Sequence, residues 1–288
     1  MKYVPKELKE NVNISKSSPL RELFVLLGGL LIIFFIIYFT LGWLIDATVS
    51  MISPPLEAQL ESVLGRFYWT DKKYSAAEEL LKRLMNDLGS YQPEERRRNV
   101  TVHVVPSSEV NAVAIPGGHI ILFSQLLKEV GSENELAMIL GHEMGHFAHR
   151  DHLRGLGRGL VLVLLSSTLF GVDSAVSKLV MNTLLTIDLR HSREQELAAD
   201  QYALQIINTK YGHVSGATDF FERLKGKRVW PAYLKFFSTH PFSADRIERI
   251  YDGIARNGYV LGPMATLDPI LANLEGEDEK ALPEGTPP

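Results

Sequence analysis

The feature that most constrains this chain is an uninterrupted apolar run from residue 23 to residue 45. It reads LFVLLGGLLIIFFIIYFTLGWLI and contains no charged residue. Roughly twenty such residues cross the hydrocarbon core of a bilayer as a helix. Tyr38 and Trp43 lie toward the end of the run, where aromatic rings favour the membrane surface. We therefore predict one transmembrane anchor at 23–45. A cleaved signal peptide is the alternative, but the run is longer than the apolar part of a typical signal peptide.

Charge on either side of the run predicts its orientation. The basic residues before it are Lys2, Lys6, Lys9, Lys16 and Arg21, and no Lys or Arg follows until Arg66. Because cytoplasmic flanks carry the excess of Lys and Arg, we predict that segment 1–22 is cytoplasmic and that the rest lies outside. In a bacterium this places the remaining domain on the periplasmic side of the inner membrane, with the membrane itself as one partner.

Composition limits the kinds of site that the chain can build. It has 288 residues, a formal net charge of −4 and no cysteine. Because no basic stripe is present, nucleic acid is not an expected partner. Because cysteine is absent, histidines and carboxylates would have to hold any metal. Residues 46–273 are long enough for one domain with a core, and the acidic, Pro- and Gly-rich tail 274–288 is predicted to be disordered.

Hydrophobic periodicity predicts a mainly α (α+β) fold, in which packed helices accompany a small sheet behind the transmembrane helix. The expected strands are 100–106, 111–115 and 119–123, with a Pro-Gly-Gly turn between the last two. The expected helices are 54–64, 72–89, one that begins at Ser132, 192–207 and 244–255. Ser132 and Glu135 have the spacing of a capping box.

A second apolar stretch, GLVLVLLSSTLFGV at 159–172, is too short to cross a bilayer alone. The segment that follows, 174–187, has apolar residues at helical spacing. We expect a buried helical pair inside the domain. A hairpin that dips into the membrane is the alternative.

The chemistry concentrates in ILGHEMGHFAHRDHLRG, where His142, Glu143 and His146 form the pattern H-E-x-x-H. On a helix, residues four apart share a face, so both imidazoles reach one ion, while Glu143 is placed to act as general base on a water that the metal activates. Gly141 and Gly145 interrupt the same helix, and glycine there costs up to about 1 kcal/mol relative to alanine. Close approach of another backbone, a substrate or a neighbouring helix would account for them.

A catalytic zinc site usually has three protein ligands and a water, and the chain offers two candidates for the third ligand. His152 has metzincin spacing, but it reaches the metal only if the helix breaks after His146. Glu196 is the other candidate, and Asp200 one turn later would accept a hydrogen bond from a ligating imidazole. A solvent-facing acidic helix is the alternative explanation for this pair of acids.

Four segments in order, NAVAIPGG, LGHEMGHFAHRD, SREQELAAD and THPFSADRI, resemble the gluzincin family of zinc metallopeptidases that includes HtpX and the CAAX prenyl proteases (peptidase family M48). The likeness covers roughly residues 55–260. It implies a zincin-like domain that binds one Zn²⁺ per chain through His142, His146 and Glu196, with Glu143 as the catalytic acid and base.

The same resemblance assigns further residues. It implies that His240, before Pro241, and Arg246 face the metal and help hold the substrate carbonyl or its oxyanion. The segment NAVAIPGGHI would form an edge strand beside the cleft, to which an extended peptide could add. Asn111 and Ala112 are then candidate contacts for the substrate backbone.

The chain also departs from this family. The HtpX and prenyl-protease branches have several membrane spans, whereas one clear span is present here, without the chamber that a prenylated substrate needs. The pattern therefore predicts a compact, singly anchored bacterial member. We expect a zinc-dependent endopeptidase that hydrolyses peptide bonds of misfolded, membrane or envelope proteins, with protein quality control as a role by analogy.

Two alternatives to this function stay open. One is a metzincin-type protease that uses His152. The other is a non-proteolytic, zinc-stabilised envelope chaperone or adaptor. Structural zinc sites are usually closed by four ligands, and His149, three residues after His146, is the nearest candidate for the fourth.

Overall fold

The computed structural model of the chain describes residues 18–52, 74–91, 100–185, 191–225, 240 and 245–274. Within these residues the protein is mainly helical and carries one three-stranded sheet, as predicted. The predicted helix 54–64, Pro241, and most of the predicted N-terminal segment and acidic tail lie outside the described residues.

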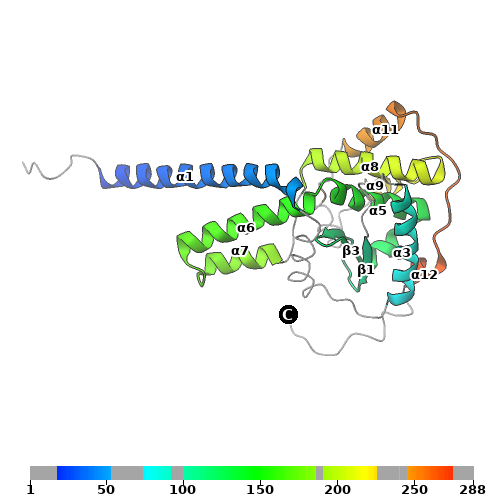
Figure 1. The fold of residues 1–288 in the computed structure, drawn as a ribbon, viewed down its shortest axis with the longest axis horizontal. Coiled ribbons are helices and arrows are strands. Elements are labelled where there is room, and N and C mark those ends of the chain that lie inside the picture. The colour runs from blue at the N-terminus through cyan, green and yellow to red at the C-terminus, as the bar shows by residue number, and fades with distance from the viewer. Residues whose placement is uncertain are drawn as a thin grey trace, which may run out of the picture.

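The predicted anchor forms part of one long helix, α1 (Pro19–Thr48), which continues into a short 3-10 helix, η1 (Val49–Met51). Helix α1 extends away from the rest of the molecule (Figure 1), and none of its side chains is buried. Its length and composition suit a membrane span. The same features suggest that this helix anchors the protein in a membrane.

The three predicted strands are present as β1 (Thr101–Val105), β2 (Ala112–Ile115) and β3 (His119–Phe123). Their order is β1-β3-β2, with β1 parallel to β3 and β2 antiparallel to β3. Gly117 and Gly118 supply the positive φ values, 95° and 82°, that the turn between β2 and β3 requires. Strand β2 therefore lies at an edge of the described sheet, as expected from its sequence.

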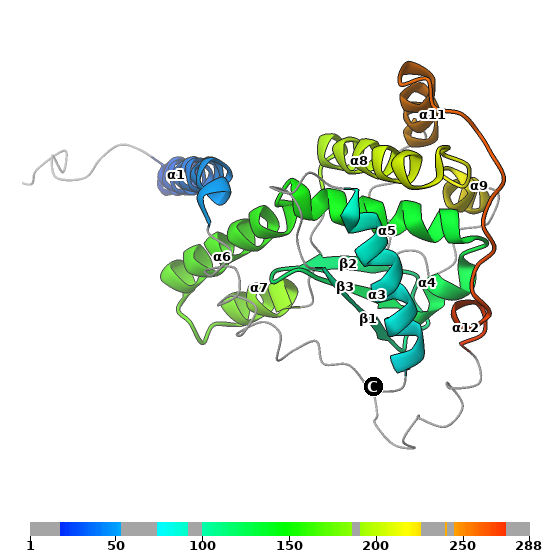
Figure 2. The same ribbon diagram turned by 45° about the vertical axis from the view of Figure 1, so that its right-hand side comes forward.

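Helix α5 (Glu133–Ala148) forms the centre of the domain, between the sheet and helix α8 (Figure 2). Its side chains from residue 134 to residue 147 are all buried. The helices around it are α3 (Ser75–Ser90), α4 (Ser124–Glu129), α8 (Arg193–Tyr211), α9 (Asp219–Lys225), α11 (Arg246–Arg256) and α12 (Pro269–Ala272). Burial on every side explains why α5 has apolar residues around its whole circumference.

The two glycines of α5 allow α8 to pack closely. A Cβ atom at Gly141 would lie 3.2 Å from Cα of Ala203, and one at Gly145 would lie 2.7 Å from Cα of Ala199. The second distance is shorter than real Cβ contacts, so no side chain fits there. Of the reasons considered for these glycines, close helix–helix packing is the one that the structure bears out.

The predicted capping box at the start of α5 is only half formed. Ser132 Oγ accepts a hydrogen bond from Glu135 N at 3.2 Å, as expected. The Glu135 carboxylate instead accepts from Gly131 N at 3.0 Å and pairs with Arg223. The complete capping box is in α8, between Ser192 and Gln195.

The expectation of a buried helical pair at 159–187 is wrong. Helices α6 (Asp151–Phe170) and α7 (Ala175–Leu185) form a hairpin that projects from the domain on the side where α1 leaves it (Figures 1 and 2). In α6 only the first turn and Ser166 are buried. Hydrophobic periodicity predicted these helices correctly. It does not tell whether the apolar side chains of a helix pack against protein or face the outside of the domain.

Candidate metal centre

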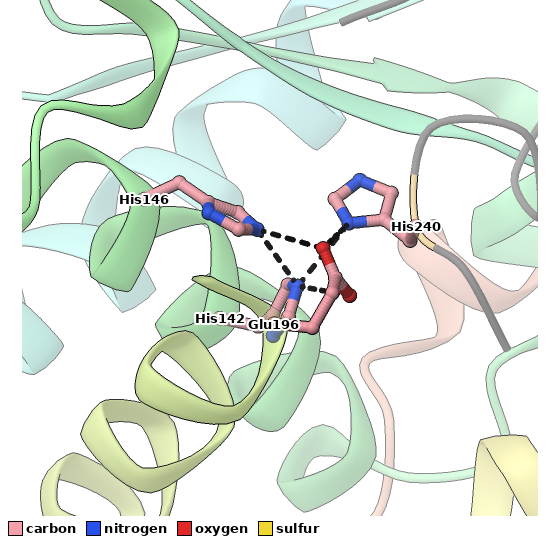
Figure 3. A group of neighbouring side chains, drawn as sticks. All are labelled: His142, His146, Glu196 and His240. Carbon is pink, nitrogen blue, oxygen red and sulfur yellow. Dashed lines mark hydrogen bonds and ion pairs between the residues drawn. The ribbon is translucent and has the colours of Figure 1, made fainter. Parts of the chain in front are cut away.

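Two helices bring the predicted metal ligands together. His142 and His146 lie on successive turns of α5, and Glu196 lies in the first turn of α8 (Figure 3). The Nε2 atoms of the two imidazoles are 3.1 Å apart. The Glu196 oxygens lie 3.5 Å from His142 Nε2 and 3.4 Å from His146 Nε2. All three side chains are buried.

These separations fit a metal ion. Ligand atoms that bind a tetrahedral ion at about 2.0–2.1 Å lie roughly 3.3 Å from one another, which matches the spacing among His142, His146 and Glu196. Two imidazole nitrogens and a carboxylate oxygen are also donors that divalent transition metals accept. The residues present therefore fit the metal that the sequence motif implies.

A carboxylate contacts the Nδ1 atom of each imidazole, on the side of the ring opposite the cluster. Asp200 Oδ1 lies 2.8 Å from His142 Nδ1, and Asp151 Oδ2 lies 2.9 Å from His146 Nδ1. Each Nδ1–H donates to its carboxylate, which directs the Nε2 atom of each ring into the cluster. Asp200 was predicted for this position from the sequence, whereas Asp151 was not.

A helix break explains why Asp151 was missed. Arg150 has φ 60°, the only positive φ among the non-glycine residues described, and it separates α5 from α6. This break turns Asp151 back toward His146, whereas His152 packs edge-on against Phe147 with ring centroids 4.7 Å apart. The break that metzincin spacing needs is thus present, but it does not bring His152 into the cluster.

Charges in the cluster strongly shift its titration. Burial by itself lowers the pKa of His142, but the negative charges of Glu196 and Asp200 outweigh burial and raise that pKa to about 10. Burial acts to raise the pKa of Glu196, but the positive charges of His240 and His142 hold it below its usual range. Without a metal, the cluster therefore binds a proton in the place of the cation.

Arg246, at the start of α11, is buried and contacts the carboxylates of Asp200 and Glu196. Its guanidinium donates to both oxygens of Asp200 at 2.8 Å, and its NH1 atom lies 2.6 Å from Glu196 Oε2. The Phe221 ring lies under the guanidinium, 4.5 Å from centroid to Cζ. Arg246 is thus beside the ligands, as expected, and its positive charge compensates two buried acids.

Glu143 differs from the other acids of the site. Its side chain is 1% exposed, and neither carboxylate oxygen has a hydrogen-bond partner among the described residues. His240 Nε2 lies 3.5 Å from Glu143 Oε1. A buried carboxylate in this condition is costly unless a water, a metal or a substrate completes its surroundings.

His240 is as close to the predicted ligands as they are to one another. Its Nδ1 atom is 3.1 Å from Glu196 Oε1 and 3.2 Å from His142 Nε2 (Figure 3). It is therefore within reach of the same ion as the three predicted ligands. His149, the fourth ligand that we considered for a structural site, instead ends α5 and lies beside Tyr202.

His191 is a further residue that the sequence analysis missed. Its ring stacks on that of His146 at a centroid distance of 3.8 Å and an interplanar angle of 13°. Burial, followed by the positive charges of His146 and His240, lowers the pKa of His191. A neutral ring therefore stacks on one face of the His146 imidazole. No motif singled it out, because it lies just before the cap of α8.

The two predicted substrate contacts lie at the start of the edge strand β2. Both Asn111 and Ala112 are fully buried, and Asn111 Oδ1 accepts a hydrogen bond from Ala112 N at 3.0 Å. The main chain of Asn111 also accepts from Phe123 N at 3.1 Å. The first bond occupies the Ala112 N–H, and the second continues the pairing of β2 with β3. Substrate binding by this pair stays a prediction.

Comparison with known proteins agrees with this geometry. The family model described as "Peptidase family M48" matches residues 72–253. The mitochondrial metalloendopeptidase OMA1 of Saccharomyces cerevisiae is 30% identical over 158 residues, which are 52% of this chain and 45% of that protein. The metalloprotease LoiP of Escherichia coli is 28% identical over 189 residues, 64% of this chain and 74% of that protein.

The metalloprotease YcaL of Escherichia coli is 29% identical over 164 residues, 54% of this chain and 63% of that protein. The match thus spans less than half of the yeast protein but about three quarters of LoiP. The matched region contains all the residues described above that surround the metal cluster. The match of the family model over 72–253, together with the His, His and Glu cluster inside it, identifies this chain as a member of peptidase family M48.

Proposed function

We propose that the chain is a zinc-dependent endopeptidase in which His142, His146 and Glu196 bind the metal and Glu143 is the general base. The observation that carries the proposal is the Glu143 carboxylate, which is buried beside the cluster without a hydrogen-bond partner among the described residues. Leaving such a group unsatisfied costs free energy. In peptide hydrolysis, the attacking water would be the hydrogen-bond partner of this carboxylate, and the carboxylate would accept its proton.

The donor set supports zinc as the metal. Two imidazoles and one carboxylate, with a further position open, are the usual protein ligands of catalytic zinc. When bound, zinc would lower the pKa of a water molecule and polarise a peptide carbonyl. Asp200 and Asp151 fix the orientation of the rings, and their charge increases the affinity of His142 and His146 for a cation.

The remaining residues take the following roles in the proposal. Glu143 accepts a proton from the attacking water and delivers it to the leaving amine. We assign to the His240 Nε2–H, 3.5 Å from Glu143, the stabilisation of the negative charge that the substrate carbonyl would develop. Arg246 keeps Glu196 and Asp200 ionised and in place.

Chelation tests the proposal directly. The purified full-length protein in detergent should degrade casein, lose this activity with 1,10-phenanthroline, and recover it with an equivalent of Zn²⁺. Glu196→Ala should lower the bound zinc, whereas His152→Ala should leave it unchanged. Casein cleavage that survives chelation would contradict the proposal. Loss of zinc in His152→Ala but not in Glu196→Ala would favour the metzincin alternative.

One observation favours a second function, a zinc-stabilised chaperone or adaptor without proteolysis. With His240 as a fourth ligand the site would be closed, as in structural zinc sites. The two functions differ in the same assay. A structural site predicts that His240→Ala lowers the melting temperature and that neither form cleaves casein, whereas the peptidase predicts cleavage by the wild-type protein.

For the whole chain, we propose a membrane-tethered domain, residues 46–273, on the periplasmic side of a bacterial inner membrane, with proteins of the envelope as substrates. Five basic residues precede the apolar run 23–45, and none follows it until Arg66, which supports this orientation. Because the chain has no cysteine, Leu261→Cys gives a unique label site. A membrane-impermeant maleimide should label this cysteine in intact spheroplasts. Labelling only after lysis would mean that the domain lies on the cytoplasmic side.

A further inference from the structure

The α6–α7 hairpin exposes an apolar surface that the domain does not cover. Large exposed side chains follow both of its helices: Leu160, Leu164, Leu169, Phe170, Val172 and Leu179. From residue 159 to residue 172 the sequence contains no charged residue. Contiguous apolar surface of this kind indicates contact with a membrane or with another protein.

The hairpin is joined to the helix that carries the membrane anchor. Asp46, near the end of α1, pairs with Arg158 and lies 3.8 Å from Arg154 Nε at the base of α6. Just beyond them, a Cβ atom at Gly157 would meet the Ile45 side chain at 2.8 Å. The apolar surface of the hairpin therefore continues that of α1, and the charged groups lie together at the domain end of both helices.

Three hydroxyl groups of the hairpin bond to its own backbone, as a lipid environment requires. Ser166 Oγ donates to Val163 O at 3.0 Å, and Thr168 Oγ1 donates to Leu164 O at 2.8 Å. In the turn, Ser177 Oγ donates to Gly171 O at 2.8 Å. Thr40 and Thr48 of α1 bond to carbonyls of their own helix in the same way.

The length of the hairpin limits how far it reaches. From Arg158 to Phe170 the helix rises about 18 Å, whereas the hydrocarbon core is about 30 Å thick. The whole of α6 is long enough to span a bilayer. Its first turn is buried in the domain, however, and Arg154 and Arg158 pair with Asp46, so the apolar part that projects does not reach across the core. Asp173 and Lys178, 3.8 Å apart at its tip, would lie near the midplane if the hairpin stood upright. Charges at that depth are expensive, which favours an inclined hairpin within one leaflet.

We propose that the α6–α7 hairpin inserts into the membrane leaflet that faces the domain, so that the protein contacts lipid through two elements rather than through α1 alone. The occupant of the apolar surface is lipid acyl chain. Its continuity with α1, its aliphatic character and its internally bonded hydroxyl groups favour lipid over a second copy of the chain or a soluble partner. This inference does not depend on peptidase activity.

The full-length protein without cysteine allows a direct test in lipid vesicles. Leu164→Cys, at a side chain that is 61% exposed, carries a nitrobenzoxadiazole label. Leu261→Cys is the matched control, because Leu261 is 70% exposed. It belongs to the segment between α11 and α12, which lies on the opposite side of the domain from α1 (Figure 2). Vesicles contain phosphatidylcholine with bromine on one acyl chain, and aqueous iodide is the second quencher.

The expected result is that bromolipid quenches the label at position 164 at least twofold and iodide leaves it bright, with the reverse at position 261. Quenching of position 164 by iodide to the same extent as position 261 would place the hairpin in water and overturn the proposal. Protection from both quenchers would mean that protein covers it, which also overturns the proposal. Val172→Cys repeats the measurement if Leu164→Cys fails to fold.

Discussion

At the metal cluster, the orientation of each imidazole depends on a carboxylate outside the H-E-x-x-H motif. The spacing of the motif was enough to predict that His142 and His146 face one ion, because that follows from the period of a helix. Asp151 and His191 could not be predicted, because Asp151 depends on the left-handed backbone of Arg150 and His191 lies before the N-cap of α8 rather than in a described helix. Local periodicity carries no information about either.

Removing Asp151 should weaken metal binding. Its carboxylate holds His146 Nδ1 at 2.9 Å, and loss of such a partner typically lowers metal affinity by about 10–100-fold. We expect that loss for Asp151→Ala, a smaller loss for Asp151→Asn, and none for the exposed control Asp252→Ala. Competition with a chromophoric chelator measures the affinity, and an unchanged affinity in Asp151→Ala would show that the ring needs no carboxylate.

Metal binding should also tighten as the pH rises. Against burial, Glu196 and Asp200 raise the pKa of His142 to about 10 in the metal-free protein, so the ring is protonated at neutral pH and the metal displaces that proton. This group alone should increase the affinity about tenfold per pH unit until the pH approaches its pKa. Affinities measured between about pH 6 and pH 8 that do not change with pH would contradict a raised pKa.

At the scale of elements, the sequence predicted the three strands and the two helices that build the site, because amphipathic periodicity and capping residues are local signals. It failed at the α6–α7 hairpin, where helix identity was correct and the surroundings were not. The cause is physical, since the same apolar residues suit a protein core and a lipid phase. The exposure of α6 in the folded protein and its packing against α1 distinguish the two.

The close packing of α5 on α8 yields a prediction for a matched pair of variants. Gly145→Ala would force a Cβ atom to 2.7 Å from Cα of Ala199, so α8 must move and carry Glu196 away from the two histidines. Overpacking of this kind costs about 1–3 kcal/mol of unfolding free energy. We expect a lower melting temperature and less bound zinc in the purified protein.

The control for this variant is Gly141→Ala, one turn earlier. There the added Cβ atom would lie 3.2 Å from Cα of Ala203, a contact that a shift of a few tenths of an ångström relieves. Higher intrinsic helix propensity of alanine, up to about 1 kcal/mol, offsets that strain. Equal zinc content and equal melting temperatures in the two variants would show that helix separation does not set the geometry of the ligands.

At the scale of the whole molecule, Arg150 connects the helix of the metal cluster to the end of α1. Arg150, which follows the end of α5, donates to Val49 O at 3.0 Å and to Ile52 O at 2.7 Å at the end of α1 and η1. The helix that carries His142 and His146 therefore ends where the anchor joins the domain. A peptidase built in this way would act on chains close to the membrane surface.

The central claim is that Glu143 performs general base chemistry beside a bound zinc ion. Zinc content and casein cleavage, measured together on the wild-type protein and on Glu143→Gln, test it most directly. We expect one equivalent of zinc in both, and a cleavage rate in Glu143→Gln lower by a factor of about 10²–10⁴. Cleavage at the wild-type rate by a variant with its full equivalent of zinc would contradict the account.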